Sequence, residues 1–176
     1  MTELRIVHTA DLEPALRSAL RAMLDATFDR FSDDAFDNAL GGLHALVLDG
    51  GEVLGHASVV QRRLMHGGRP LRAGYIEAVA VRAGQRRRGH GDAMMAGLEQ
   101  VVRSGYDLGA LGASPQGARL YAARGWQLWR GPSSALTPDG IRRTQDKDGA
   151  IWVLPGPVPL DLDGELTADW RAGSLW

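Results

Sequence analysis

One basic turn constrains the fold of this 176-residue chain more than any other feature. The apolar run Val79-Ala80-Val81 is followed by Arg86-Arg87-Arg88-Gly89-His90-Gly91, and a helical pattern begins there. The first turn of a helix carries unpaired backbone N–H groups and partial positive charge. A pyrophosphate accepts hydrogen bonds from such groups where the backbone is unobstructed, which two glycines allow. The turn therefore predicts a binding site for a phosphate ligand.

Other interpretations of the turn are weaker or stay open. The formal net charge is -1 and no aromatic residue interrupts the arginines, which argues against a nucleic-acid-binding arm. No Gly-Lys-Ser/Thr follows, so the turn is not a P-loop, and the glycine spacing does not match the dinucleotide-binding fingerprint. From the residues alone, a solvated basic turn remains the alternative to a phosphate site.

The composition excludes several other classes of site. The chain has no cysteine, which excludes disulfides, thiolate zinc sites and a cysteine nucleophile. Its five histidines show no ligand spacing, so we expect no metal site. Neither a signal peptide nor an apolar run long enough to span a membrane is present. We therefore expect a cytoplasmic protein with no membrane or nucleic-acid partner.

Hydrophobic periodicity predicts an alternating series of strands and helices. A first helix follows Asp11, a good N-cap residue, with Pro14 in its first turn, and a second helix starts at Ser32 or Asp33. The apolar face of the first helix is Leu12, Leu16, Leu20, Met23 and Leu24. We expect strands over residues 4–8, 44–48, 53–61, 71–81, 108–111, 126–129 and 151–154, and further helices over residues 89–103 and 116–123.

Two segments fall outside this series. Residues 131–149 are rich in Pro, Ser, Asp and Gly and are expected to form a long loop, which in a compact domain is usually functional or mobile. Residues 155–176 form a C-terminal tail. No repeat and no second domain is detectable, so we expect residues 1–176 to form a single α/β domain with a mixed sheet.

Two motifs resemble one family. Arg86-x-x-Gly89-x-Gly91 after Val79-Ala80-Val81 is similar to the acetyl-coenzyme A motif of the GNAT superfamily of N-acetyltransferases. The segment ARLYAARGW, residues 118–126, resembles the family's Leu-Tyr-x-x-x-Gly-aromatic segment. The order of elements also matches that fold along nearly the whole chain. The resemblance implies the acyl-CoA N-acyltransferase fold, acetyl-CoA as co-substrate and no metal.

The resemblance also implies roles for named residues. The coenzyme-binding residues would be Val79, Ala80, Val81, Arg86, Arg87, Arg88, Gly89, His90 and Gly91. Glu77, on the same strand face as Val79, would be the general base, acting through a water. Tyr121 would be the general acid that protonates the leaving thiolate. Without the family, Glu77 is equally a structural carboxylate and Tyr121 an aromatic that packs a helix on the sheet.

Further segments resemble one subfamily. LGGLHALV, VVQRRL, AGYIEAVAVR, YDLGAL and DWRAGSLW are similar to the aminoglycoside 2'-N-acetyltransferases, which implies antibiotic resistance as an activity and a homodimer as the assembly. This subfamily folds its C-terminal tail into the acceptor cleft. The acceptor-binding residues expected on that basis are Asp34, Glu77, Ala78, Gly112, Lys147, Ser174 and Trp176, the last through its carboxylate.

The chain departs from the subfamily pattern on the acceptor side. Arg30 and Lys147 occupy regions where acids are expected, and Ser174 and Gly112 replace an Asp and a Ser. Each departure removes negative charge or a polar contact, so we expect an acceptor that is less cationic than a deoxystreptamine aminoglycoside, as kasugamycin is. The alternatives are a GNAT enzyme for another small amine or a protein amine, and a binding protein for acetyl-CoA or an aminoglycoside without catalysis.

Overall fold

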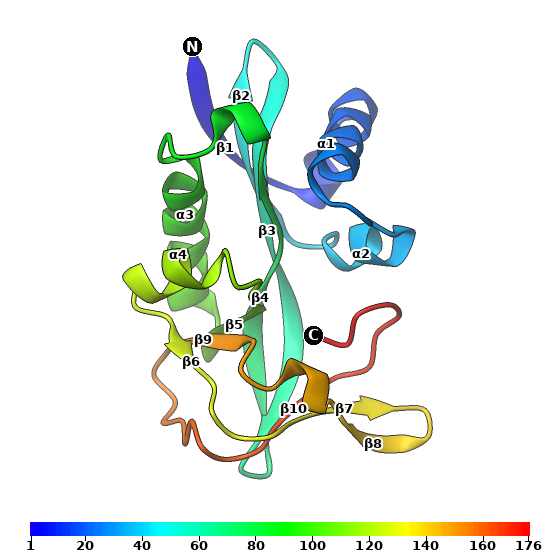
Figure 1. Cartoon of the computed structure of the whole chain (residues 1–176), viewed down its shortest axis with the longest axis vertical. Coiled ribbons are helices and arrows are strands. Elements are labelled where there is room, and N and C mark those ends of the chain that lie inside the picture. The colour runs from blue at the N-terminus through cyan, green and yellow to red at the C-terminus, as the bar shows by residue number, and fades with distance from the viewer. The chain divides into compact units, whose positions relative to one another are not determined.

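A computed structural model describes residues 1–176 (Figure 1). The chain divides into two compact units. The first unit comprises residues 1–60 and 76–100, and the second comprises residues 61–75 and 101–176. Two long strands, β3 (Glu52–His66) and β4 (Arg69–Val81), contribute residues to both units. The predicted mixed α/β architecture is confirmed.

The first unit contains three strands that pair in an antiparallel series. β1 (Thr2–His8) pairs antiparallel with β2 (Leu43–Asp49), and β2 pairs antiparallel with β3. Gly50 and Gly51 form the turn between β2 and β3, both with positive φ, which glycine adopts without steric cost. The side chains of β2 from His44 to Leu48 are all buried, so this strand is covered on both faces.

The helices of the first unit are α1 (Pro14–Thr27), α2 (Asp33–Asn38) and the start of α3 (His90–Gly105). The predicted N-cap at Asp11 is wrong. Asp11 ends a short 3-10 turn, η1 (Thr9–Asp11), and Leu12 is extended, so helical backbone starts only after Glu13, with Pro14 as its first residue. The N-cap of α2 is Ser32, as predicted, and its hydroxyl accepts from the Ala35 N–H at 3.1 Å.

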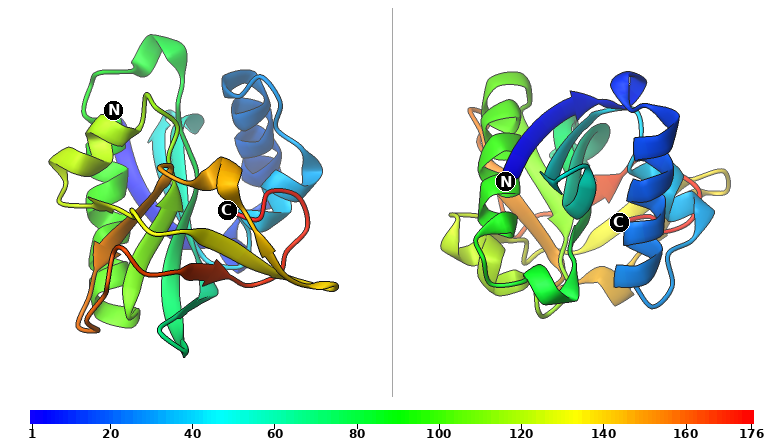
Figure 2. Two further views of the ribbon diagram at one scale, coloured as in Figure 1. Left: turned by 60° about the horizontal axis from the view of Figure 1, so that its bottom comes forward. Right: turned by 90° about the horizontal axis from the view of Figure 1, so that it is seen from above.

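Helices cover both faces of these strands, as two views show (Figures 1 and 2). On one face, Leu20, Met23 and Leu24 of α1 and Phe36 of α2 pack in one core with apolar residues of β2 and β3. On the other face α3 approaches so closely that a Cβ added at Gly97 would lie 2.7 Å from the Ile6 side chain of β1. The strands are therefore held between two helical layers.

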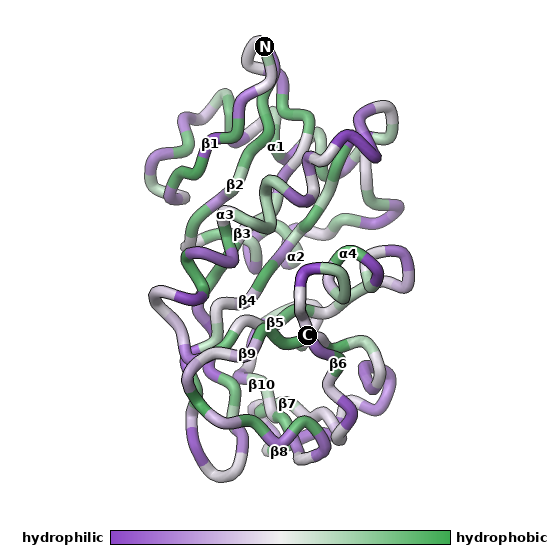
Figure 3. Tube along the Cα trace, turned by 90° about the vertical axis from the view of Figure 1, so that its left-hand side faces the viewer, coloured by the Kyte–Doolittle hydropathy of each residue, from purple (hydrophilic) through white to green (hydrophobic).

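The second unit is a mixed sheet with strand order β6-β9-β5-β4-β3-β10-β7-β8. β5 (Leu108–Gly112) runs parallel to β4 and antiparallel to β9 (Ile151–Pro155), which also pairs with β6 (Gln127–Leu128). The helix α4 (Ala118–Ala123) follows β5. The hydropathy trace marks β2 of the first unit and β5 of the second as apolar (Figure 3). The predicted strands and helices are thus present, with shifted bounds.

The loop predicted over residues 131–149 is wrong, because most of it is ordered secondary structure. β7 (Ser133–Thr137) and β8 (Gly140–Arg143) form an antiparallel hairpin, and η3 (Gln145–Lys147) is a 3-10 turn. The Pro138-Asp139-Gly140 cluster, which suggested a loop, is the turn of this hairpin. The tail also contains a strand, β10 (Leu166–Ala168), which pairs parallel with β7 and antiparallel with β3 (Figure 2).

No helix of the structure is long and apolar enough to cross a membrane.

Candidate active site

The basic turn has a left-handed backbone at two places. After β4 ends at Val81, a short 3-10 turn, η2 (Ala83–Gln85), leads to Arg87 with a φ of 61° and Gly89 with a φ of 81°. The Ala93 N–H donates to the Gly89 carbonyl at 3.0 Å and so forms the first turn of α3. A Cβ added at Gly89 would meet no atom within 4 Å, so the backbone there is open to a ligand.

The arginines of the turn differ in their partners. The Arg82 guanidinium pairs with Glu52, and the Nε of Arg86 donates to the Val81 carbonyl at 3.2 Å. Arg87 and Arg88 are exposed and have no side-chain partner, and Gly89 is exposed beside them. Open backbone at a helix start, with two free guanidinium groups, fits a pyrophosphate with an additional phosphate.

A further left-handed residue lies inside β4. Ala78 has a φ of 48°, between the half-buried residues Glu77 and Val79. The Ala78 carbonyl accepts from Nδ1 of the buried His56 at 2.8 Å. A positive φ is uncommon for alanine and occurs where neighbours hold the backbone in place. The main chain of Glu77, Ala78 and Val79 therefore departs from regular strand geometry next to the turn.

Tyr121 belongs to the second unit and is buried on α4. Only 6% of its surface is exposed, and its ring lies 6.0 Å from the ring of Trp126. Burial raises the pKa of the Tyr121 phenol to about 12, because the low-dielectric surroundings disfavour the phenolate. The hydroxyl therefore keeps its proton at neutral pH, as a proton donor must.

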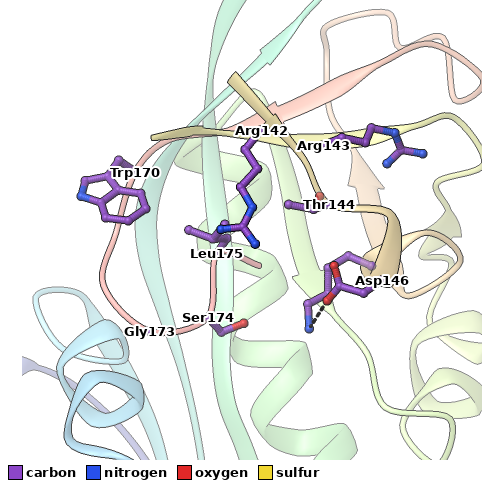
Figure 4. Close-up of a pocket in the computed structure, with 9 residues that line it drawn as sticks. Arg142, Arg143, Thr144, Asp146, Trp170, Gly173, Ser174 and Leu175 are labelled. Atoms are coloured by element: carbon purple, nitrogen blue, oxygen red, sulfur yellow. Dashed lines mark ion pairs between the residues drawn. The ribbon is translucent and has the colours of Figure 1, made fainter. Parts of the chain in front are cut away.

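The second unit also contains a cavity of about 450 Å³ (Figure 4). It is lined by residues 142–144, 146 and 147 around the end of the hairpin and by residues 170 and 173–175 of the tail. Figure 4 shows the Arg142 side chain extending into the space toward Leu175, whereas Arg143 points away from it. Lys147 is paired with Asp146 at 3.5 Å, and Arg143 donates to Asp148 at 2.9 Å.

Arg142 is the one lining cation without a carboxylate partner. The ion pair with Arg143 lowers the pKa of Asp148 to about 2, so that carboxylate stays ionised and compensated. With Arg143 paired to Asp148 and Lys147 paired to Asp146, the positive charge of Arg142 is the one left uncompensated in the lining. The pocket is thus suited to a ligand with an anionic group near Arg142.

Buried polar contacts hold the tail against the hairpin. The indole N–H of Trp176 donates to the Thr144 hydroxyl at 2.9 Å, and that hydroxyl lies 2.8 Å from the Ser133 hydroxyl. The Ser174 hydroxyl donates to the main-chain carboxylate of Trp176. The Trp176 side chain is buried. These contacts fix the segment that carries Ser174 and Leu175 at the pocket.

Gly112 lies beside an aromatic ring flanked by arginines in the second unit. A Cβ added at Gly112 would sit 3.6 Å from the Tyr75 hydroxyl and 3.7 Å from the Trp176 backbone carbon, which is ordinary contact distance. The guanidinium groups of Arg62 and Arg171 lie 4.7 Å and 5.2 Å from the centre of the Tyr75 ring. Within this unit the structure therefore brings Gly112 to Trp176, and Lys147 and Ser174 to one pocket.

The predicted residues divide between the two units. Those of the first unit are Asp34, Glu77, Ala78, Val79, Ala80, Val81 and residues 86–91, and those of the second are Gly112, Tyr121, Lys147, Ser174 and Trp176. Asp34 lies exposed in the first turn of α2. No group of three or more His, Cys, Asp or Glu side chains is placed to hold a metal ion.

Residues 4–129 match the family described as an acetyltransferase (GNAT) domain. The chain belongs to this acetyltransferase family. The basic turn, the irregular segment of β4 and Tyr121 all fall inside the matched residues, so the two motifs that suggested the family lie in its conserved domain.

A curated relative is similar over nearly the whole length. The aminoglycoside 2'-N-acetyltransferase of Mycolicibacterium fortuitum is 45% identical over 177 residues, covering 98% of this chain and 91% of the relative. The similarity continues well beyond residue 129, where the GNAT domain match ends, into the segments that line the pocket.

Solved structures agree on the fold. A GNAT acetyltransferase from Brucella melitensis in complex with acetyl-CoA has a TM-score of 0.63 and 18% identity, covering 98% of this chain and 97% of that one. A GNAT N-acetyltransferase from Escherichia coli in complex with CoA has a TM-score of 0.62 and 17% identity, covering 97% and 89%. At these identities the likeness identifies the GNAT fold alone.

The sequence did not identify Arg142, Thr144 and Trp170 as pocket residues. Nor did it identify His56 as the hydrogen-bond partner of Ala78. The first three lie in segments that were interpreted as a loop and a tail. The x-Pro-Asp-Gly turn at Pro138-Asp139-Gly140 is the signal that would have predicted the hairpin and placed Arg142 on a strand.

Proposed function

We propose that this GNAT enzyme transfers the acetyl group of acetyl-CoA to the 2'-amine of an aminoglycoside antibiotic, and so inactivates it. The observation that carries the proposal is the 45% identity to an aminoglycoside 2'-N-acetyltransferase over 98% of the chain. A likeness confined to residues 4–129 would support acetyl transfer in general. Its extension into residues that line the pocket supports a related acceptor as well.

The acetyl donor binds at the turn between β4 and α3. The backbone of residues 86–91 accommodates the pyrophosphate, and Arg87 and Arg88 reach the remaining phosphate, which their exposure and lack of partners support. His90 begins the helix that supplies these amides. The main chains of Val79, Ala80 and Val81 bind the pantetheine arm in the manner of an added strand.

The reaction needs a base, an acid and a hydrogen-bond donor to the thioester carbonyl oxygen. Glu77 accepts a proton from the acceptor ammonium through a water, and the freed amine attacks the thioester carbon. The Val79 N–H polarises the carbonyl oxygen as charge develops on it. The new C–N bond forms, the C–S bond breaks, and Tyr121 protonates the departing thiolate. The nitrogen, now part of an amide, releases its second proton to water, and water reprotonates the Tyr121 phenolate. The phenol of Tyr121 carries its proton at neutral pH before the step.

The acceptor carries a carboxylate. Arg142 extends into the pocket without a partner, and the lining cations outnumber the single lining carboxylate, Asp146. Lys147 and Ser174 line the same pocket, and the proposal assigns them to the acceptor together with Trp176, Gly112, Asp34 and Ala78. A polycation would meet repulsion at Arg142, whereas kasugamycin, an amino-sugar antibiotic with a carboxylate and a 2'-amine, would form an ion pair there.

An acceptor panel tests the proposal. Steady-state rates of thiol release are measured with kasugamycin, gentamicin and tobramycin, and NMR of the products locates the acetyl group. We expect acetylation at the 2'-amine and the highest kcat/KM with kasugamycin. Higher values with gentamicin and tobramycin would contradict the carboxylate, and acetylation of unrelated amines alone would contradict the aminoglycoside.

We also propose a homodimer in the cytoplasm and residues 1–176 as a single catalytic domain. Light scattering coupled to size exclusion tests the assembly. A molar mass equal to one chain would contradict it.

A further inference from the structure

A chain of buried polar groups in the first unit ends at the irregular residue of β4. His44 and His56 are both fully buried, and Nδ1 of His44 lies 2.9 Å from Nε2 of His56. At one end, Nε2 of His44 lies 2.7 Å from the Thr9 hydroxyl. At the other end, Nδ1 of His56 lies 2.8 Å from the Ala78 carbonyl oxygen. Four groups from three strands and a turn are thus linked in series.

The last contact fixes the proton positions in the whole series. A carbonyl oxygen only accepts, so Nδ1 of His56 carries a hydrogen and its Nε2, in the neutral ring, accepts. Nδ1 of His44 must therefore donate to His56, and Nε2 of His44 accepts from the Thr9 hydroxyl. That hydroxyl also lies 3.2 Å from the Gly42 carbonyl oxygen, but the contact with His44 is the shorter one, at 2.7 Å. The Thr9 oxygen in turn accepts from the Gly41 N–H at 2.8 Å. Every proton in the series points toward Ala78.

The surroundings keep both rings neutral. Burial lowers the pKa of His44 to about 4 and that of His56 to about 3. The charged groups that act on His44 are His8 of β1 and Arg17 of α1, and both lower its pKa further. On His56, His44 lowers the pKa, while the bond to Ala78 raises it. When both rings are neutral, each carries one hydrogen, so the hydrogen bonds of the series have one defined direction. A cationic pair would lack that direction.

Ala78 needs such a partner because of its backbone. Its φ of 48° is unfavourable for a residue with a Cβ, and neighbouring groups must maintain it. The peptide that His56 holds joins Ala78 to Val79, and Glu77 precedes it. The orientation of this peptide sets the direction of the Val79 N–H and influences where the Glu77 side chain leaves the strand.

We propose that His44 and His56 are positioning residues for acetyl transfer, which hold the Ala78 carbonyl and thereby orient the Val79 N–H and Glu77. This rests on the proposed function, which assigns those two groups to the reaction. The histidines touch neither substrate. Their effect therefore appears in kcat, where a misdirected N–H costs transition-state stabilisation, more than in protein stability.

Nitrogen NMR of the wild-type protein tests the series without any acceptor. We expect both histidines as neutral rings with the hydrogen on Nδ1, unchanged between about pH 5 and pH 8. A hydrogen on Nε2 of either ring, or titration of either near its ordinary pKa, would overturn the proposal. Because this measurement needs no turnover, it stands even if no aminoglycoside is acetylated.

Two substitutions of His56 separate positioning from structural support. The amide nitrogen of H56N replaces Nδ1 and still donates to Ala78, but it cannot reach His44. The longer H56Q keeps a partner for His44 and leaves the Ala78 carbonyl without its donor. Each variant loses one buried hydrogen bond, so we expect similar losses of thermal stability. We expect kcat to fall about tenfold or more in H56Q and about threefold or less in H56N.

His66 supplies the matched control. Its Nδ1 lies 2.9 Å from the Glu165 carbonyl and its Nε2 accepts from the Asp161 N–H at 3.1 Å, so it also bridges two backbone groups. H66N and H66Q should lower stability without changing kcat. Equal kcat values for H56N and H56Q would overturn the proposal. If wild-type protein acetylates no aminoglycoside, the proposed function fails. The affinity for acetyl-CoA, measured by calorimetry, then tests the positioning role. We expect H56Q to bind acetyl-CoA more weakly than H56N does.

Discussion

The turn between β4 and α3 and the pocket of the second unit offer a ligand different kinds of contact. The turn is one continuous segment, and it offers open backbone around Gly89 and two unpartnered arginines. The pocket joins two separate segments, and it offers side chains of which most are already paired. Backbone recognition tolerates changes of side chain, whereas a pocket of side chains can change its ligand by one substitution.

Loss of the Tyr121 hydroxyl should have the largest effect, because the proposed function assigns that group to the chemical step and not to the binding of either ligand. We expect Y121F to lower kcat by about a hundredfold or more. Acetyl-CoA affinity should change little, because the buried ring remains in place. Steady-state thiol release measures kcat, and calorimetry measures the affinity for acetyl-CoA. An unchanged kcat would remove Tyr121 from the reaction.

The raised pKa of Tyr121 also predicts a pH dependence of stability. Its pKa is about 12 in the folded protein and about 10 when unfolded, so the neutral phenol stabilises the fold fully below about pH 10. This contribution is lost as the pH rises toward the folded value. The difference in melting temperature between wild type and Y121F should therefore be constant below about pH 10, and wild type should lose stability relative to Y121F as the pH rises further. A difference that stays constant at every pH would contradict burial as the cause.

The pocket should respond to a single charge. We expect R142E to lower kcat/KM for a carboxylate-bearing acceptor about tenfold and to raise it for polycationic aminoglycosides. R130E is the control, since Arg130 is an exposed arginine paired with Asp163 and lies outside the pocket lining. The ratio of kcat/KM between kasugamycin and tobramycin reports the change. An equal shift of that ratio in both variants would show that net charge, and not Arg142, determines the preference.

The same two regions differ in how far sequence predicted them. The turn was predicted residue by residue, because its strand, glycines and helix start are neighbours in the chain and their chemistry is local. Of the residues that line the pocket, only Lys147 and Ser174 were predicted as site residues. Arg142 lies on β8, whose pairing with β7 is local but whose composition resembled a loop. The tail reaches the hairpin through the pairing of β7 with β10, and these two short strands are distant in sequence. The contact of His56 with Ala78 is equally non-local. No local pattern encodes such contacts.

Glycine substitutions in the turn test its dependence on backbone. G89A forces a side chain onto a φ of 81°, which strains the site although no atom obstructs the Cβ. We expect KM for acetyl-CoA to rise several-fold, with kcat less affected. G84A in the same turn is the matched control, because its Cβ is also unobstructed and its φ is not left-handed. If KM for acetyl-CoA rises equally in G89A and G84A, the left-handed conformation of Gly89 does not contribute to acetyl-CoA binding.

The smallest effect is expected at Asp148, whose carboxylate accepts from Arg143 and from the Ser133 hydroxyl at 3.0 Å. Its pKa is lowered to about 2, so its contribution to stability is present above about pH 4 and is lost as the pH falls toward the folded value. Both partners are partly exposed, with side chains 43% and 35% accessible, and solvent screening limits the pair. We expect D148N to lower the free energy of unfolding by at most about 1 kcal/mol at neutral pH, and by less in acid. Because Asp148 does not line the pocket, the acceptor preference should stay unchanged in D148N, in contrast to R142E. A shift of that preference would mean that the hairpin's ion pair, rather than the free guanidinium of Arg142, sets the charge that the acceptor meets.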